Sequence, residues 1–172
     1  YLSDFQSTCK KMRYASKPTI SAVAGLAIGG GFEVACQTSK MVAHMNSTLG
    51  LVETGVGLVP AGGGCKQLLA RWTQDEKYTS DHDQAALKVF DIIGYGLMAY
   101  SPLQAKKHKF FLDDDIFVLN RDNLLVEAFK QVSILKESYS APQKPTYFLS
   151  GPEVKEKMHQ VLLELEKKNI IF

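Results

Sequence analysis

The sequence predicts an α/β fold in front and a mostly helical region behind it. Short runs of small and β-branched residues, such as residues 19–24, alternate with segments of helical spacing before residue 75. Three consecutive glycines at 29–31 stand where a predicted strand hands over to a predicted helix. Behind residue 82, apolar residues recur at helical spacing in three long segments. These observations favour strands and helices in alternation, followed by helices.

The front half contains six predicted elements. Residues 4–15 form an amphipathic helix that ends before Lys17-Pro18, because the residue before a proline avoids helical geometry. The following elements are a strand at 19–24, a helix at 32–40 after the glycine turn, strands at 41–44 and 48–51, and a helix at 65–72. A Gly/Pro loop spans residues 56–64.

Behind them we expect helices at residues 84–99, 122–138 and 152–168, with an extended linker at 141–145. The last helix has Pro and Glu in its first turn and Lys in its last, which suits the helix dipole. The charge runs at 106–109 and 113–115 are interpreted as solvated loop charges. The predicted organisation is therefore a core at 1–75, a helical extension at 76–140, and a linker with a C-terminal helix at 141–172.

Composition excludes several classes of function. The chain has 172 residues, 45% hydrophobic and 22% charged, which is the profile of one globular domain or a large piece of one. A formal net charge of +2 argues against nucleic acid or an anionic membrane surface as partner. No apolar run approaches the roughly 20 residues of a membrane span.

The three cysteines and the first residue indicate the compartment and the extent of the chain. Cys9, Cys36 and Cys65 are odd in number and form no C-x-x-C pair, so neither a zinc site nor a disulfide framework is indicated. We expect three reduced thiols and a cytoplasmic location. The chain begins at Tyr1, without an initiator Met or a signal peptide, and is interpreted as an excised fragment.

The glycine turn at 29–31 can bind an anion. Glycine lets a ligand approach the main chain, and the first N–H groups of a helix lack internal partners. Such a turn can stabilise an anion or a developing oxyanion, although a packing role is an equal alternative from spacing alone. The turn is neither a phosphate-binding Walker A loop nor a dinucleotide fingerprint, because no Lys-Ser/Thr follows and the sixth position is Val34. The four histidines share no metal-ligand spacing, so no metal site is expected.

Two carboxylates accompany this turn. Glu33 falls in the first turn of the predicted helix, where the helix N-terminus alone could stabilise it. Glu53 is the one charged residue between Ser47 and Cys65. Because an isolated carboxylate is costly to bury among apolar residues, the pair favours a catalytic role over a purely structural one.

These motifs together resemble the crotonase (enoyl-CoA hydratase/isomerase) superfamily. The resemblance rests on three segments: residues 17–25 (KPTISAVAG), 27–33 (AIGGGFE) and 57–64 (GLVPAGGG). In enoyl-CoA hydratases two glutamates lie twenty residues apart, as Glu33 and Glu53 do here. The segments at 86–90 and 118–125 instead resemble the C-terminal portion of large bacterial 3-hydroxyacyl-CoA dehydrogenases of fatty-acid β-oxidation, which carry an NAD-binding part first.

The resemblance implies a partial ClpP/crotonase-type ββα-spiral core and the reversible hydration of a trans-2-enoyl-CoA. It gives Glu33 mainly the water and Glu53 mainly proton delivery. It makes the Gly30 N–H an oxyanion-hole donor and the Ala61 N–H a water-positioning group. Gly29 is expected to contact the substrate. Leu26, Phe32 and Leu58 could line the acyl pocket, and a place in the hydrophobic core is an equal alternative for all three. The chain itself needs no metal or bound cofactor, since the coenzyme A thioester is the substrate; NAD belongs to the absent dehydrogenase part.

Some residues depart from the family pattern. Val52 stands where hydratases usually have Pro, and Phe32 replaces a smaller residue. The family's N-terminal part supplies a second oxyanion donor and much of the coenzyme A contact, so we expect the fragment alone to be weak or inactive. The alternatives are another crotonase reaction, such as isomerisation, and a non-catalytic acyl-CoA-binding or assembly module. Expected partners are acyl-CoA, the rest of the same polypeptide and further copies in a homo-oligomer.

Overall fold

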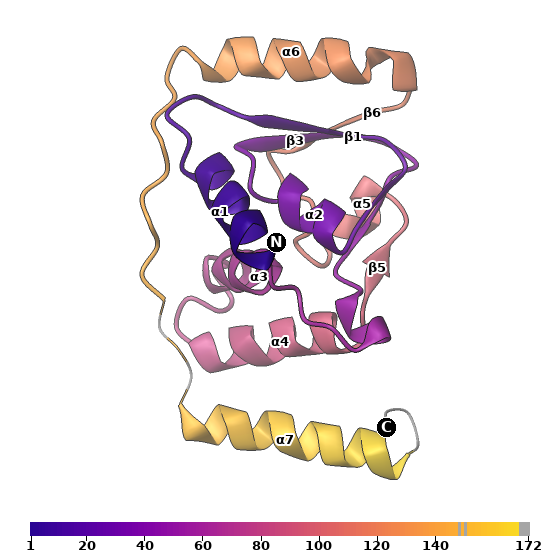
Figure 1. Ribbon diagram of the computed structural model, residues 1–172, viewed down its shortest axis with the longest axis vertical. Coiled ribbons are helices and arrows are strands. Elements are labelled where there is room, and N and C mark those ends of the chain that lie inside the picture. Colours follow the sequence, from indigo (N-terminus) through magenta and orange to yellow (C-terminus); the bar gives the residue numbers. More distant parts are fainter. Residues whose placement is uncertain (148, 150, 169–172) are drawn as a thin grey trace.

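Two small sheets, packed between helices, form the centre of the molecule (Figure 1). The computed structural model describes residues 1–147, 149 and 151–168. The first helix, α1 (Leu2–Arg13), precedes a parallel sheet in the order β1 (Ile20–Val23), β3 (Lys40–His44), β6 (Ile116–Val118). The second sheet has the order β2 (Leu26–Ile28), β4 (Thr48–Gly50), β5 (Met98–Ala99).

Helix α6 (Leu124–Leu135) covers one face of the first sheet (Figure 1). Val42 of β3 pairs in register with Ala22 and Ile116, and it packs against Leu124 and Ala128 of α6. The small and β-branched residues of β1 and β3 suit this contact, because they fit a pleated surface buried under a helix. The first sheet is therefore joined to the back half of the chain.

The second sheet lies within the main core. Leu49 of β4 pairs with Ala27 on one side and Ala99 on the other, and all three side chains are buried. Helix α2 (Gly30–Ala35), helix α3 (Gly64–Thr73) and helix α4 (His82–Gly94) surround this sheet and place Phe32, Leu68 and Ile92 in the same core.

The predicted helix at 32–40 is shorter in the structure and begins earlier. It spans Gly30–Ala35, and β3 already begins at Lys40. The Thr38 hydroxyl donates to Ala35 O, and the Ser39 N–H donates to Thr19 O. Side-chain bonding to the backbone and pairing with the chain beside β1 therefore end the helix.

Three short strands were not predicted. They are β2, β5 and β6, with two or three residues each, too few for an alternating pattern to appear. The predicted helix at 84–99 accordingly ends at Gly94, and its last two residues form β5. The predicted helix at 122–138 begins as the 3-10 helix η2 (Arg121–Asn123) and continues as α6.

Residues 76–140 share the core of the front half. They contribute α4, β5, α5 (Pro102–Lys106), β6 and α6, and both strands pair with strands of the front half. Phe110 and Phe111 are buried in the same cluster as Phe32. The packing therefore runs on across residue 75, where a helical extension was predicted to begin.

The C-terminal segment lies on the outside of this core. After α6 the chain runs without helix or strand through residues 139–147, as the predicted linker at 141–145 requires. Helix α7 (Pro152–Lys167) then packs along α4 (Figure 1). No helix among the described residues has the length and apolar character needed to cross a membrane.

Two predicted loop charges have structural roles instead. Lys109 forms a 2.7 Å ion pair with Asp75 and lies over the Trp72 ring. The interpretation of residues 106–109 as solvated charges is therefore wrong for Lys109.

Asp115 accepts hydrogen bonds from the backbone N–H groups of Met41 and Leu112, both at 2.7 Å. The interpretation of residues 113–115 as solvated charges is therefore wrong for Asp115. Its carboxylate joins the start of β3 to the loop before β6.

Candidate active site

The glycine turn at 29–31 is built by backbone geometry that favours glycine. Gly29 has φ of 53° and caps α2, and its N–H donates to Gly50 O at 2.9 Å. This bond joins the turn to the end of β4. Gly30 is the first residue of α2, and among the described residues no acceptor bonds its N–H. The Gly30 amide is therefore available to an oxyanion.

Glu33 lies beneath this turn and is held in one orientation. Its residue is 3% exposed, and its Oε1 accepts a 2.7 Å hydrogen bond from the Gly64 N–H. Gly64 is the first residue of α3, so the carboxylate bonds an amide at a helix N-terminus, where negative charge is stabilised. The α2 and α3 termini thus meet at Glu33.

Glu53 begins the 3-10 helix η1 (Glu53–Val56), which follows β4. Both of its carboxylate oxygens are buried and have no hydrogen-bond partner among the described residues. Burial raises the pKa of Glu53 above its usual value, and the negative charge of Glu33 raises this pKa further. Burial and the Glu33 charge thus raise the Glu53 pKa together, and the two carboxyl groups are close enough to influence one another.

Three glycines leave room for the two carboxyl groups. A Cβ atom at Gly29 would lie 3.5 Å from Glu53 Oε1. At Gly62 it would lie 2.9 Å from Glu33 Oε2, and at Gly64 it would lie 3.0 Å from Glu33 Oε1. The glycines at 29–31 and the second glycine cluster, residues 62–64, therefore line the same site. The sequence motifs did not by themselves establish this.

Phe5 is a neighbour of the site that sequence reasoning missed. A Cβ atom at Gly30 would lie 3.7 Å from Phe5 Cζ, and one at Gly62 would come into direct conflict with the Phe5 ring. Phe5 belongs to α1 and is far from either motif in the sequence. Its apolar side chain on an amphipathic helix was the one signal that it contacts the interior. Its ring therefore lies beside both Gly30 and Gly62.

Ala61 stands at the edge of a cavity beside the site. Its carbonyl oxygen accepts a 2.8 Å hydrogen bond from Gln6 Nε2, which ties the second glycine cluster to α1. The cavity has a volume of about 350 Å³, and Cys9, Gln37 and Cys65 also line it. The Ala61 residue is thus tied to α1, one position before Gly62, whose own Cβ would meet Glu33.

The predicted acyl-contact residues fall into two groups. Leu26 and Leu58 are 76% and 62% exposed, so both can touch a bound molecule. Phe32 is 1% exposed and packs edge-on against Phe110, with ring centroids 4.9 Å apart. The structure brings Glu33, Glu53, Gly29 and Gly30 together and leaves Phe32 in the core.

The cysteines are free thiols. Cys9 and Cys36 are buried, and burial raises the pKa of Cys36 to about 11. Within the part of the chain that the structure describes, no three His, Cys, Asp or Glu residues are grouped as a metal site would need.

Comparisons with known proteins agree on the family. The family model described as Enoyl-CoA hydratase/isomerase matches residues 1–75. A Bacillus subtilis protein named "Probable 3-hydroxyacyl-CoA dehydrogenase" is 34% identical over 124 residues, which are 72% of this chain and 15% of that protein. The mouse protein named methylglutaconyl-CoA hydratase, mitochondrial, is 38% identical over 68 residues, which are 40% of this chain and 22% of that protein.

The chain thus spans less than a quarter of the length of these two relatives. The crystal structure of an enoyl-CoA hydratase from Bacillus anthracis superposes with a TM-score of 0.60 at 23% identity. The superposition covers 78% of this chain and 45% of that one. The likeness shows that the fold is that of the crotonases.

Proposed function

Because residues 1–75 belong to the enoyl-CoA hydratase/isomerase family, we propose that this chain adds water to a trans-2-enoyl-CoA to give a 3-hydroxyacyl-CoA. The observation that carries the proposal is the pairing of Glu33 and Glu53 at the glycine turn. One carboxylate is fixed by an amide, and the other is buried without a partner. Hydration across a double bond needs a base and an acid on one face, which this pair can supply.

In the proposed reaction the two glutamates exchange roles with respect to one proton each. Glu33 takes a proton from the water whose oxygen bonds to C3, and protonated Glu53 gives its proton to C2. The raised pKa of Glu53 supports this assignment, because burial favours the form that donates. After the step Glu33 is protonated and Glu53 is ionised, and a proton returned from Glu33 to Glu53 resets the pair.

The glycine turn at 29–31 is proposed to stabilise the negative charge that develops on the substrate. As the proton reaches C2, negative charge passes through the thioester oxygen, and the Gly30 N–H is positioned at a helix start to bind it. Removing one such donor typically costs about 10²–10³ in rate. The Ala61 N–H is assigned to the water, and Gly29, Leu26 and Leu58 are assigned to the substrate.

The setting of the site is proposed from the relatives. The name of the Bacillus subtilis relative supports a longer polypeptide with a 3-hydroxyacyl-CoA dehydrogenase part. A role in fatty-acid β-oxidation stays a prediction from the family resemblance. NAD is assigned to that part, because the glycine turn at 29–31 lacks the dinucleotide fingerprint. A homo-oligomer and a cytoplasmic location stay predictions.

Crotonyl-CoA hydration tests the proposal. The protein that carries this chain is incubated with crotonyl-CoA, and loss of the ultraviolet enoyl-thioester band is followed. Glu33→Gln and Glu53→Gln should each lower the rate by about 10²–10⁴. Glu76→Gln, at an exposed position, is the matched control and should leave the rate unchanged. Equal turnover in all three variants would contradict the proposal.

Two further measurements on the same protein, one with a 3-enoyl-CoA as substrate and one of crotonyl-CoA binding, test the two alternative functions. Conversion of a 3-enoyl-CoA to its 2-enoyl isomer without hydration would assign an isomerase. Binding of crotonyl-CoA without any turnover would assign an acyl-CoA-binding module. Either result would replace the hydratase proposal.

A further inference from the structure

A small polar pocket lies apart from the two glutamates, where α1 and α3 meet residues 142–145 of the linker. Its volume is about 200 Å³. Pockets for drug-sized molecules usually hold roughly 300–1,000 Å³. This pocket therefore suits an ion or a single small group rather than a whole metabolite.

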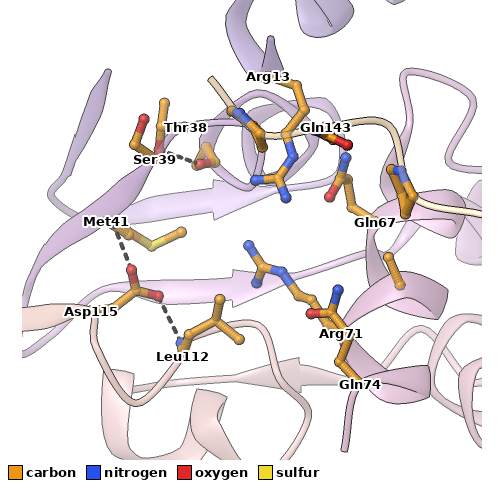
Figure 2. A pocket seen from close by; sticks show the side chains of 14 residues that line it. Arg13, Thr38, Ser39, Met41, Gln67, Arg71, Gln74, Leu112, Asp115 and Gln143 are labelled. Carbon is orange, nitrogen blue, oxygen red and sulfur yellow. Dashed lines mark hydrogen bonds between the residues drawn. The ribbon is translucent and has the colours of Figure 1, made fainter. Parts of the chain in front are cut away.

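Two arginines point into this pocket. Figure 2 shows the guanidinium groups of Arg13, the last residue of α1, and Arg71, from α3, turned toward the same space. Among the described residues, neither forms an ion pair with a carboxylate. Two facing cations repel one another, so their convergence favours an anion between them.

The hydrogen bonds of the two arginines differ. Arg71 donates to three backbone carbonyls, of Lys109, Phe110 and Cys36, which fix its position without neutralising its charge. Arg13 makes no side-chain hydrogen bond with the described residues. Arg71 is thus a fixed positive wall, while all the donors of Arg13 remain available.

Gln67 adds an unpartnered donor. Its residue is 4% exposed and lines the pocket, yet its side-chain amide has no hydrogen bond among the described residues. The Gln67 amide therefore remains free to donate to a group bound in the pocket.

Asp115 is the carboxylate in the pocket wall, and it is already satisfied. One oxygen accepts from the Met41 N–H and the other from the Leu112 N–H (Figure 2). Burial raises the pKa of Asp115, and the nearby charge of Arg71 lowers it in part. The Asp115 carboxylate and Arg71 therefore interact, and the carboxylate offsets part of the positive charge of the arginines. One carboxylate against two guanidinium groups leaves a net positive pocket.

The surface around the pocket is basic as well. No Asp or Glu occurs between Phe5 and Phe32. Lys10 and Lys11 of α1 and Lys144 of the linker line a neighbouring shallow cavity. These charges raise the local concentration of anions at the pocket.

We propose that this pocket binds a phosphate group, held between Arg13 and Arg71 with the Gln67 amide as a further donor. The planar fork of arginine suits the tetrahedral oxygens of phosphate and can bind two of them at once. The group can come from free inorganic phosphate or from a phosphate monoester whose remainder extends past the linker. The site is independent of the hydratase proposal.

Titration calorimetry in a phosphate-free buffer of fixed ionic strength tests this. The probes are inorganic phosphate and phenyl phosphate, and the protein is the full chain. Arg13→Gln should weaken binding of the better probe about tenfold or more, because hydrogen bonds to charged groups are lost. Gln67→Leu, similar in size, should also weaken it. The tighter probe identifies the source of the group.

Lys11→Gln is the matched control, since it removes the same charge from the same helix but does not line the pocket. It should weaken binding much less than Arg13→Gln does, because it removes only a surrounding charge. Thermal unfolding should show that both variants are folded. The proposal is overturned if neither probe binds the unaltered chain. It is equally overturned if Arg13→Gln and Lys11→Gln bind the probes alike.

Discussion

Substituting Gly64 by Ala should disturb the packing around Glu33. A Cβ atom there would lie 2.8 Å from Leu51 Cδ2 and 3.0 Å from Glu33 Oε1, closer than such atoms pack. Leu51 is fully buried, so it has little room to move. Overpacking of this kind costs about 1–3 kcal/mol of stability. The same shift would lengthen the Gly64–Glu33 hydrogen bond and lower any activity that depends on Glu33.

Gly31→Ala is the control for this change. Gly31 lies in the first turn of α2, as Gly64 lies in that of α3, and a Cβ atom there meets nothing within 4 Å. It should leave stability unchanged or raise it by up to about 1 kcal/mol, since Ala favours helix. Urea unfolding of both variants measures the difference. The steric reasoning is refuted if Gly64→Ala is as stable as Gly31→Ala.

Three further predictions concern side chains around the core and the site. Phe32→Ala should cost about 3–5 kcal/mol in urea unfolding, because the ring is buried, whereas Leu58→Ala should change stability by less than about 0.5 kcal/mol; equal effects would contradict their placement. The pKa of Glu53 is raised in the folded state, so the folded chain binds the proton more tightly than the unfolded chain does. The free energy of unfolding therefore falls as the pH rises above 4.5, the ordinary pKa of this carboxyl group. Glu53→Gln should therefore unfold at higher urea than the unaltered chain at about pH 8 and at similar urea below about pH 4; a deficit at the higher pH would reverse the sign. Asp115→Ala loses two amide donors and should cost about 1–3 kcal/mol, while Asp114→Ala, on the exposed side of the same loop, should cost little in the same measurement.

The glycine turn could be predicted because its information is local. Strand, glycines, helix and Glu33 follow one another within a few residues, and local spacing places them together. Glu53 could be singled out because it is the one charge in an uncharged stretch. Its burial without a partner could not be predicted, since that depends on how η1 packs against Gly29.

Features that depend on distant parts of the chain were harder to predict. β5 and β6 exist because β4 and β3 offer them partners, and the two or three residues of each carry no periodic signal. Asp115 looks like a loop charge beside Asp113 and Asp114, and only the position of the Met41 amide gives it a buried role. Phe32 follows the glycine turn like a ligand-contact residue, and only Phe110 makes it a core residue.

The most direct test of the central claim, that Glu33 and Glu53 act as one unit, is the hydration rate of the double variant. Crotonyl-CoA turnover is measured for Glu33→Gln, Glu53→Gln and the two together in the protein that carries this chain. Because residues that act as a unit are not additive, each single loss should be nearly as large as the loss in the double variant. Losses that simply multiply, or an unchanged rate, would contradict the account.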